Sequence, residues 1–412
     1  MRRVVITGVG AVTPIGIGAD ASWHALCRGE SGVTRITRWD ASRHRSQVAA
    51  EVQGFNPEDF VGKKQIRTMD LFILYAMAAA RMAMEDSGFD VASVHANRAG
   101  LVVGSALQGM QTVEYNQQLF LDGMPDKISP FFVPGFIANM AACQIAIAFG
   151  IKGPLYCPVT ACATGTHAIG DAFKALQRGD VDFMLAGGAE AAITPLICAG
   201  FDALKVTSPR NDEPKRASRP FDKDRDGFAP GEGSGIVTLE GLESALDRGA
   251  KIYAEIVGYG ITNDAYHIVS TDPQGDGAAR CMQMALADAG ISPDQVDYIN
   301  AHGTSTIVND LSETMAIHTV FGEYGPKVPV SSNKSMIGHL MGGSGAVEAI
   351  FTALTLKYGI IPPTVNYDTP DPQCDLNIVG NVAQRVDVKT AISNSFGFGG
   401  TNGVLVLNKF QE

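Results

Sequence analysis

Two patterns of hydrophobic residues alternate along the chain. Short, mostly apolar runs bounded by glycine or polar residues are typical of buried strands, and they lie at residues 3–6, 100–103, 183–186, 236–239, 252–257, 298–300, 328–331, 391–393 and 404–407. Between them, apolar residues recur at spacings of three and four, which predicts helices over residues 69–86, 162–178, 277–289 and 345–356. Strands that alternate with such helices predict an α/β fold with buried sheets.

The two halves of the chain weakly repeat each other. A strand that runs into glycines opens each half, in VVITGVG near the start and in AEIVGYG from residue 254. A strand that follows a glycine-rich turn closes each half, in GEGSGIVTLE and in GFGGTNGVLVLN. We therefore expect two similar halves, residues 1–250 and residues 251–412. A chain of 412 residues has room for two average domains or one fused unit.

Two segments depart from this alternation. Residues 207–230 are charged and rich in Asp, Arg and Pro, so we expect a surface loop between the halves or over a cleft. Residues 128–151 carry no charge and are long enough to span a bilayer, but prolines and amide side chains interrupt them. They fit better as a central helix in a large core, because such a helix is apolar all round. We expect no membrane span.

Composition narrows the class of protein. Hydrophobic residues make up 45% of the chain and charged residues 18%, which is typical of a globular protein with a large core. A net charge of −11 argues against nucleic acid as a partner, because duplex-binding proteins usually carry a basic surplus. The seven cysteines include no CxxC pair, so we expect neither a disulfide framework nor a thiolate zinc site, and a reducing cytoplasm. The N-terminal apolar run is too short for a signal peptide.

Cys162 is the first candidate for chemistry, in PVTACATGTHA. The segment predicts a strand that turns sharply into a helix starting at about Cys162, with small residues at the turn. A helix N-terminus favours a thiolate through its dipole and its unpaired N–H groups. Taken alone, the segment fits a small buried cysteine better, since that is the commonest fate of the residue. The other six cysteines lack such a setting and are assigned to packing.

Two further segments place a histidine after a strand end. In NAHGTST, His302 enters a loop of small hydroxyl residues, and in SSNKSMIGH, Lys334 precedes His339. Strand ends that lead into loops are where α/β folds place their sites. For each histidine alone, a hydrogen-bonded structural role is the more frequent one.

The last segment, NSFGFGGTNG, surrounds two phenylalanines with glycine and other small residues. A phosphate-binding loop would be followed by a helix, but here the strand VLVLN follows. We interpret the segment as a mobile loop with an aromatic gate. GVG at residue 8 resembles a dinucleotide fingerprint, but Thr13 replaces its third glycine and Pro14 follows, so we do not expect nicotinamide binding.

Together, TACATG, NAHGTST, KSMIGH and NSFGFGGTNG closely resemble, in order and spacing, the β-ketoacyl-acyl carrier protein synthases, nearest to the synthase II type. The resemblance covers essentially the whole chain, including ISPFFVP, ASRPFDKDRDGF and DAYH. It implies a thiolase-like fold, with five layers in the order αβαβα and two pseudo-repeated halves, and a homodimer. It also implies the reaction. An acyl group passes from a carrier protein to Cys162, malonyl carrier protein loses CO2, and the enolate attacks the thioester.

The resemblance also implies roles for single residues. Cys162 would hold the acyl chain as a thioester, which stays reactive toward a carbanion. His302 and His339, as neutral imidazoles, would hydrogen-bond the malonyl thioester carbonyl and stabilise its enolate. Lys334 would tune the two histidines, and Glu313 matches the family's partner for this lysine.

Other positions match the family by motif. The N–H groups of Cys162 and Phe398 would form an oxyanion hole, and Phe398 would also gate the acyl chain, with Asp264 on a companion loop. Hydrogen bonds to the pantetheine arm would come from Thr304 and Thr306. The acyl pocket would be lined by Leu107, Phe201 and Met341. An acidic carrier protein would dock on a basic patch made of Lys64, Arg67, Lys127 and Lys205; each of these taken singly is better explained as an ordinary solvated charge.

The resemblance implies no organic cofactor. Some members hold a monovalent cation, and the residues at the matching positions are Asn300, Ala301, Glu348, Ser393 and Asn394; buried polar packing explains them equally well. Departures from the family pattern are Ala163-Thr164, Asn333, Ile337, Ile307-Val308-Asn309 and Gln108. None removes a catalytic group, but chain length and pathway stay open between fatty acid, polyketide and polyene synthesis.

Two alternatives have weaker support. A non-catalytic chain-length partner subunit of a ketosynthase heterodimer typically lacks the cysteine, whereas here the cysteine, both histidines and the lysine are present. A biosynthetic thiolase uses a late cysteine as base, and the only late cysteine, Cys374, stands in PDPQCDLN, which is typical of a surface turn. We therefore expect an active condensing enzyme.

Overall fold

A mixed sheet of 12 strands runs through the molecule, in a computed structural model that describes residues 1–411. The first half of the chain contributes β1 (Val4–Thr13), β2 (Gly16–Ile17), β5 (Ala99–Gly104), β6 (Leu155–Tyr156), β7 (Phe183–Glu190) and β8 (Gly233–Gly241). The second half contributes β9 (Ala254–Asn263), β10 (Tyr298–Asn300), β11 (Pro329–Ser331), β13 (Asn377–Ile378), β15 (Thr390–Gly397) and β16 (Thr401–Asn408).

The strand order shows the repeat that the sequence predicts. It is β6-β5-β7-β8-β1 in the first half and β11-β10-β15-β16-β9 in the second, with β13 added outside β11. In each half the outer strands pair in parallel and the inner strands pair antiparallel. The halves join where β1 pairs with β9, from Val4–Ile256 to Ile6–Ala254.

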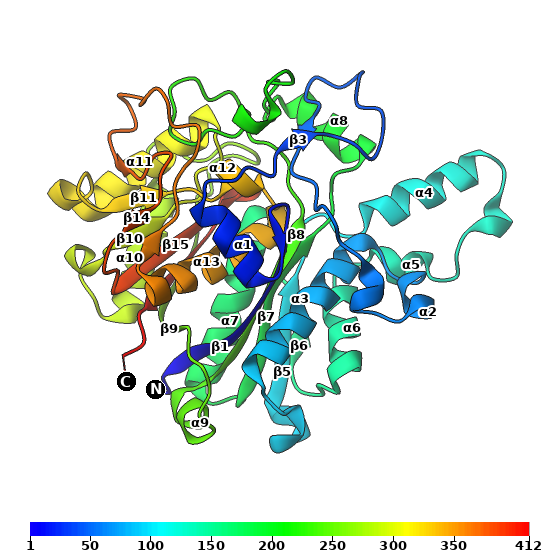
Figure 1. The fold of residues 1–412 in the computed structure, drawn as a ribbon, viewed down its shortest axis with the longest axis horizontal. Coiled ribbons are helices and arrows are strands. Elements are labelled where there is room, and N and C mark those ends of the chain that lie inside the picture. The colour runs from blue at the N-terminus through cyan, green and yellow to red at the C-terminus, as the bar shows by residue number, and fades with distance from the viewer. Residues whose placement is uncertain (412) are drawn as a thin grey trace.

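Helices cover the two half-sheets in three layers (Figure 1). The outer layers are α3 (Leu71–Ser87) with α6 (Met140–Phe149), and α10 (Asp276–Ala289) with α11 (Ile307–Phe321). The middle layer is α7 (Thr164–Arg178) with α13 (Ser344–Tyr358), and α13 is buried from Ser344 to Leu356 because it packs on both half-sheets. This arrangement confirms the five-layered α/β fold. The shorter elements are α1 (Ala19–Cys27), α2 (Lys63–Ile66), α4 (Met110–Leu121), α5 (Phe132–Phe136), α8 (Pro195–Leu204), α9 (Leu242–Asp247), α12 (Lys334–Ile337), β3 (Thr34–Arg35), β4 (Val48–Ala49), β12 (Ile360–Ile361) and β14 (Gln384–Arg385).

Each predicted strand and helix is present, and several strands are longer than predicted. The first continues to Thr13 because its glycines belong to the strand. A Cβ atom at Gly10 would lie 1.9 Å from the carbonyl oxygen of Ala79 in α3. Glycine therefore lets α3 lie directly on β1, and it does not mark a turn here.

The prediction of one buried central helix over residues 128–151 is wrong. The segment forms α5 and α6, separated at Ile137 by extended backbone, and they lie at the edge of the first half (Figure 1). Only one face of α6 is buried, and Ile147 is 72% exposed. No helix within residues 1–411 is long and apolar enough to cross a membrane.

Two smaller expectations also need correction. Residues 207–230 pass over a cavity as expected, but Ser218, Phe221 and Asp222 are buried, because ion pairs and hydrogen bonds tie the loop to the second half. Cys374 is not on a surface turn, since its side chain is 1% exposed and packs in the apolar core under α11.

Candidate active site

Cys162 lies at a sharp turn in front of the middle layer. The turn is a 3₁₀ helix, Ala161–Ala163, and α7 begins two residues later than predicted, at Thr164. Ala161 has a φ of +50°, which a residue with a Cβ adopts only where its surroundings enforce it. Gly165 makes the turn compatible with the core, because a Cβ there would lie 2.6 Å from the N atom of Ala346 in α13.

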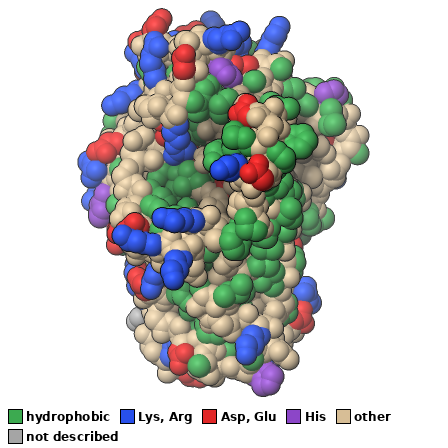
Figure 2. Space-filling model, turned by 90° about the vertical axis from the view of Figure 1, so that its right-hand side faces the viewer, with side chains coloured by type: hydrophobic (Ala, Val, Ile, Leu, Met, Phe, Trp, Pro, Cys, Tyr) green, Lys and Arg blue, Asp and Glu red, His purple; other side chains and the backbone are tan. Residues whose placement is uncertain are grey.

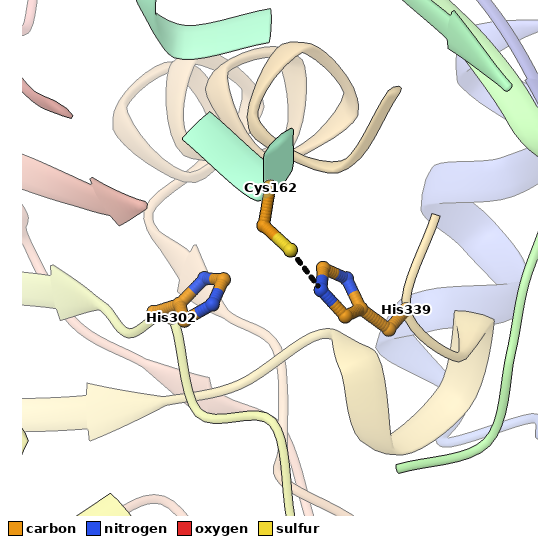
Figure 3. Close-up of side chains that lie close together, drawn as sticks. All are labelled: Cys162, His302 and His339. Carbon is orange, nitrogen blue, oxygen red and sulfur yellow. Dashed lines mark hydrogen bonds between the residues drawn. The ribbon is translucent and has the colours of Figure 1, made fainter. Parts of the chain in front are cut away.

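The structure brings Cys162 together with both histidines (Figure 3). The Cys162 Sγ atom lies 2.9 Å from Nε2 of His339, and Nδ1 of His339 lies 3.0 Å from the hydroxyl oxygen of Ser344. His302 faces the same space, with its ring centre 5.5 Å from that of His339. All three side chains are buried. They belong to different elements, and the fold gathers them into one compact site.

Burial sets the protonation of this group. It raises the pKa of the Cys162 thiol to about 12, although the Lys334 ammonium and the Phe398 N–H act in the opposite direction. Burial, and then the charge of Lys334, hold the pKa values of His302 and His339 well below the usual range. The resting site therefore holds a thiol and two neutral imidazoles. The thiolate expected from the helix N-terminus is not the resting form. The sulfur is hydrogen-bonded to His339 Nε2, and His339 Nδ1 is hydrogen-bonded to the Ser344 hydroxyl.

Glu313 is not the partner of Lys334, contrary to the prediction. Its carboxylate accepts the backbone N–H groups of His302 (2.9 Å) and Gly303 (2.8 Å), and burial raises its pKa to about 7. Lys334 instead forms a fully buried ion pair with Glu348 of α13. The reason is geometric: Lys334 begins α12 and faces the middle layer, whereas Glu313 lies on α11 behind the His302 loop.

Two loops meet over the sulfur. Phe398 begins a turn that ends at Gly400, and its backbone N–H acts to lower the pKa of the Cys162 thiol. The N–H of Asp264 donates to the carbonyl oxygen of Gly400 (2.9 Å), and the Asp264 carboxylate accepts from Asn402 Nδ2 (2.7 Å). Gly399 and Gly400 have φ values of +80° and +76°, so this turn depends on glycine. The loops predicted to be gating companions are thus in direct contact.

A cavity of about 340 Å³ opens onto Cys162. Its walls include His302, His339, Phe398, Met341, Lys205 and the threonines Thr304 and Thr306, whose hydroxyl oxygens are 2.9 Å apart. Leu107 and Phe201 do not line this cavity; they pack with Met341 and Phe228 in an apolar cluster beside Cys162. The predicted acyl-pocket residues therefore lie together: Met341 is part of the cavity wall, and Leu107 and Phe201 pack behind it.

The predicted basic patch is spread over several elements. Lys64 and Arg67 lie on and just after α2, Lys127 lies after α4, and all three are exposed. Of the four residues, Lys205 alone lines the cavity that leads to Cys162. Figure 2 shows this side of the molecule, where hydrophobic side chains cover a broad area and Lys and Arg gather along a hollow.

The residues matched to a cation site surround the ends of β10, β11 and β15. Asn300 Nδ2 donates to the Ser393 hydroxyl (3.1 Å), and Asn333 Nδ2 donates to Asn300 Oδ1 (2.9 Å). Within residues 1–411, the buried oxygens of this region without a hydrogen-bond partner are Asn333 Oδ1, Glu348 Oε2 and Asn394 Oδ1. For Ala301, the structure gives a backbone N–H that donates to Ser331 O (2.9 Å).

The sequence did not single out Glu190. This carboxylate ends β7, is fully buried, and accepts hydrogen bonds from Ser105 Oγ (3.0 Å) and from the N–H groups of Ala106 (2.9 Å) and Gly342 (3.0 Å). It ties the segment before Leu107 to the segment after His339. Burial raises its pKa to about 7. The available signal was a lone carboxylate inside the small, apolar run LAGGAEAA at a strand end.

Comparisons with known proteins agree with this geometry. The model of the β-ketoacyl synthase N-terminal domain matches residues 1–245, and that of the C-terminal domain matches residues 253–368. The 3-oxoacyl-[acyl-carrier-protein] synthase 2 of Staphylococcus aureus (strain COL) is 51% identical over 410 residues, which cover 100% of this chain and 99% of the relative. The synthase 2 of Coxiella burnetii (strain RSA 493) is 50% identical over 408 residues, 99% of each chain.

Solved structures give the same result. A ketosynthase described in complex with its type II polyketide synthase acyl-carrier protein superposes with a TM-score of 0.93 at 36% identity, covering 100% of both chains. A β-ketoacyl synthase from Burkholderia phymatum STM815 has a TM-score of 0.92 at 36% identity, again over 100% of both chains. The chain therefore belongs to the β-ketoacyl synthase family. It is a condensing acyltransferase, as the four sequence segments predicted.

Proposed function

We propose that this chain is a 3-oxoacyl-[acyl-carrier-protein] synthase that lengthens a carrier-bound acyl chain by decarboxylative condensation with malonyl carrier protein. One observation carries the proposal: a cysteine sulfur lies 2.9 Å from a neutral imidazole, beside a second imidazole, at the base of a cavity. Relatives with the same named activity match over the full length of the chain.

In the first half-reaction, the Cys162 sulfur attacks the carbonyl carbon of the acyl thioester. Its proton moves to Nε2 of His339 and then to the carrier thiolate that leaves, so protons balance. The oxyanion formed in between accepts hydrogen bonds from the N–H groups of Cys162 and Phe398. The products are an acyl thioester on Cys162 and the free carrier thiol.

In the second half-reaction, the malonyl thioester carbonyl lies between His302 and His339. The bond to the carboxylate breaks, CO2 leaves, and the electron pair forms an enolate that N–H groups of both imidazoles stabilise. For His339 this step uses the tautomer with the proton on Nε2, in which the Ser344 hydroxyl donates to Nδ1. The enolate carbon attacks the thioester on Cys162, and the sulfur departs and regains a proton from solvent through His339. Neutral imidazoles suit this step, because the low histidine pKa values keep them as hydrogen-bond donors that do not protonate the enolate outright.

Lys334 acts on the histidines from behind. Its charge lowers the pKa of both imidazoles, and Glu348 keeps the ammonium in place. We include a monovalent cation in the proposal, because Asn333, Glu348 and Asn394 each have a buried side-chain oxygen without a hydrogen-bond partner, and oxygen is the donor atom that hard cations prefer. Such an ion would hold the strand ends that carry His302 and Lys334, and it takes no part in bond breaking.

The proposed partners are acyl- and malonyl-loaded carrier proteins and a second copy of this chain. Lys205 at the cavity mouth offers an acidic carrier protein its first contact. The homodimer is supported by exposed apolar side chains on and around α4, α5, α6 and β6 (Figure 2): Tyr115, Phe120, Leu121, Phe131, Val133, Ile147, Tyr156 and Val159. Light scattering of the purified chain should give twice the chain mass; a monomer would favour a heterodimer with a related subunit.

The two half-reactions can be separated by substitution. His302→Ala should lose condensation with malonyl carrier protein while still transferring acyl groups to Cys162, because His339 alone contacts the sulfur. The exposed His24 provides the control, and His24→Ala should keep both activities. An equal loss of acyl transfer and condensation in His302→Ala would contradict the proposed division of roles.

A further inference from the structure

The three catalytic side chains also form a potential metal site. The ligand atoms of Cys162, His302 and His339 all lie within 4.8 Å of one another, and all three residues are buried. Within the described residues, 1–411, this is the only group of three or more His, Cys, Asp or Glu side chains with such spacing. We propose that the free enzyme binds one Zn²⁺ ion through Cys162, His302 and His339, and that the ion inhibits it reversibly.

The donor set has the chemistry that zinc prefers. Thiolate sulfur and imidazole nitrogen are its usual ligands, and sites with three protein ligands leave a fourth position for water. Zn–S and Zn–N bonds place tetrahedral ligand atoms roughly 3.5 Å apart. The sulfur and His339 Nε2 are closer than this, at 2.9 Å, so a small rotation of the two side chains admits the ion. The cavity of about 340 Å³ gives the ion access and holds the fourth ligand.

Charge around the site permits the ion. Lys334 is the cation that acts on both histidines, but its buried ion pair with Glu348 offsets it. Glu190 and Glu348 are the carboxyl groups whose charge, when ionised, raises the pKa of the Cys162 thiol. Binding releases the Cys162 thiol proton to solvent, so the Zn–thiolate unit carries one positive charge instead of two. Both imidazoles bind as neutral ligands, and no oxidation or reduction is involved.

The consequence is selective for one state of the enzyme. An acylated sulfur is no longer a thiolate ligand, so acylation and zinc binding exclude each other. Zinc should therefore compete with the acyl carrier protein substrate for the free enzyme and spare the acylated enzyme. This kinetic consequence rests on the proposed acylation of Cys162, whereas the metal binding itself does not depend on it.

Cobalt provides a direct readout, because Co²⁺ bound to a thiolate absorbs in the near ultraviolet and tetrahedral Co²⁺ absorbs strongly in the visible. The full chain, freed of metal, should bind one Co²⁺ with both features, and Zn²⁺ should displace it. Cys162→Ala should abolish the thiolate band. Affinity for Zn²⁺ can be measured by competition with a chromophoric chelator. It should fall by more than about tenfold in Cys162→Ala and in His302→Ala, because loss of a residue that only hydrogen-bonds a metal ligand already costs about 10–100-fold in affinity. Cys143→Ala, a half-buried cysteine of α6, should bind like the wild type.

Alkylation of Cys162 with iodoacetamide gives a second measurement that needs no variant. Zn²⁺ should protect the thiol from alkylation until a chelator is added, and the alkylated protein should not bind the metal. Unchanged metal binding after alkylation, or in Cys162→Ala, would overturn the inference. If zinc binds as stated but carrier-bound acyl groups never reach Cys162, the proposed function fails alone; if acylation occurs and zinc does not bind, only this inference fails.

Discussion

The buried ion pair between Lys334 and Glu348 predicts a large, pH-dependent and non-additive loss of stability. Both side chains are 0% exposed. Lys334→Met keeps a long, unbranched side chain at this position but leaves the Glu348 carboxylate without its cation. Removal of one partner from a buried pair costs about 3–5 kcal/mol of unfolding free energy, whereas replacement of both by apolar residues is often neutral. The double variant Lys334→Met/Glu348→Leu should therefore lie within about 1 kcal/mol of the wild type.

The pH dependence has a definite sign. Burial already raises the pKa of Glu348, and Lys334 is the group that opposes this. Without Lys334 the carboxyl group holds its proton to higher pH in the folded state than in the unfolded chain. Below the pKa of Glu348 in the unfolded chain, the carboxyl group is protonated in both states and its burial costs little. As pH rises above that value, the unfolded chain loses the proton more readily than the folded protein, so the free energy of unfolding falls. The deficit of Lys334→Met should grow from about pH 5 to about pH 8, and the double variant should not show this growth.

Urea unfolding of the wild type, Lys334→Met, Glu348→Leu and the double variant measures the effect. Trp23 is a suitable probe, because it stacks on Tyr358 at the end of α13, with ring centres 6.0 Å apart, and α13 carries Glu348. The two single changes should show a coupling free energy of about 3 kcal/mol or more. Additive single changes, or a Lys334→Met deficit below about 1 kcal/mol at both pH values, would refute the assignment of Glu348 as the partner.

Two further predictions concern Glu190 and the turn over the sulfur. Burial raises the pKa of Glu190 from 4.5 to about 7, so the folded protein keeps a proton that the unfolded chain loses, and stability falls as pH rises through this window. Glu190→Gln should flatten that fall by up to ~3 kcal/mol in urea unfolding at about pH 5 and pH 8; an unchanged slope would exclude Glu190 as its source. A Cβ at Gly400 would lie 2.8 Å from Asp264 Cβ, whereas one at Gly399 has no atom within 4 Å. Gly400→Ala should therefore slow acylation of Cys162 more than Gly399→Ala in a quench-flow assay, and equal rates would contradict a role for the contact between the loops.

Periodicity predicted the elements well because the strands are short, buried apolar runs and because apolar residues recur at spacings of three and four along the helices. It could not place residues 128–151 correctly. α5 and α6 carry apolar side chains on a side that no other segment within residues 1–411 covers; Ile147, for example, is 72% exposed. Apolar composition indicates that a segment will be buried, but it does not distinguish burial in the core of the same chain from burial against a partner.

The candidate site was predicted by motif, and its long-range pairings were not. Cys162, His302 and His339 are far apart in sequence, and only the fold brings them within reach. The partner of Lys334 was wrong because Glu313 and Glu348 both lie on helices, and sequence spacing does not say which helix faces the lysine. Burial also decided the protonation of Cys162, which a helix N-terminus alone would have set the other way.

Covalent loading of Cys162 is the most direct test of the central claim. The purified chain should be incubated with an acyl-loaded carrier protein in the absence of malonyl carrier protein, and its intact mass should be measured. We predict one acyl adduct per chain in the wild type and in Cys143→Ala, no adduct in Cys162→Ala, and release of the adduct when malonyl carrier protein is added. An adduct that persists in Cys162→Ala, or a wild-type chain that never gains one, would contradict the assignment of Cys162 as the residue that holds the acyl chain.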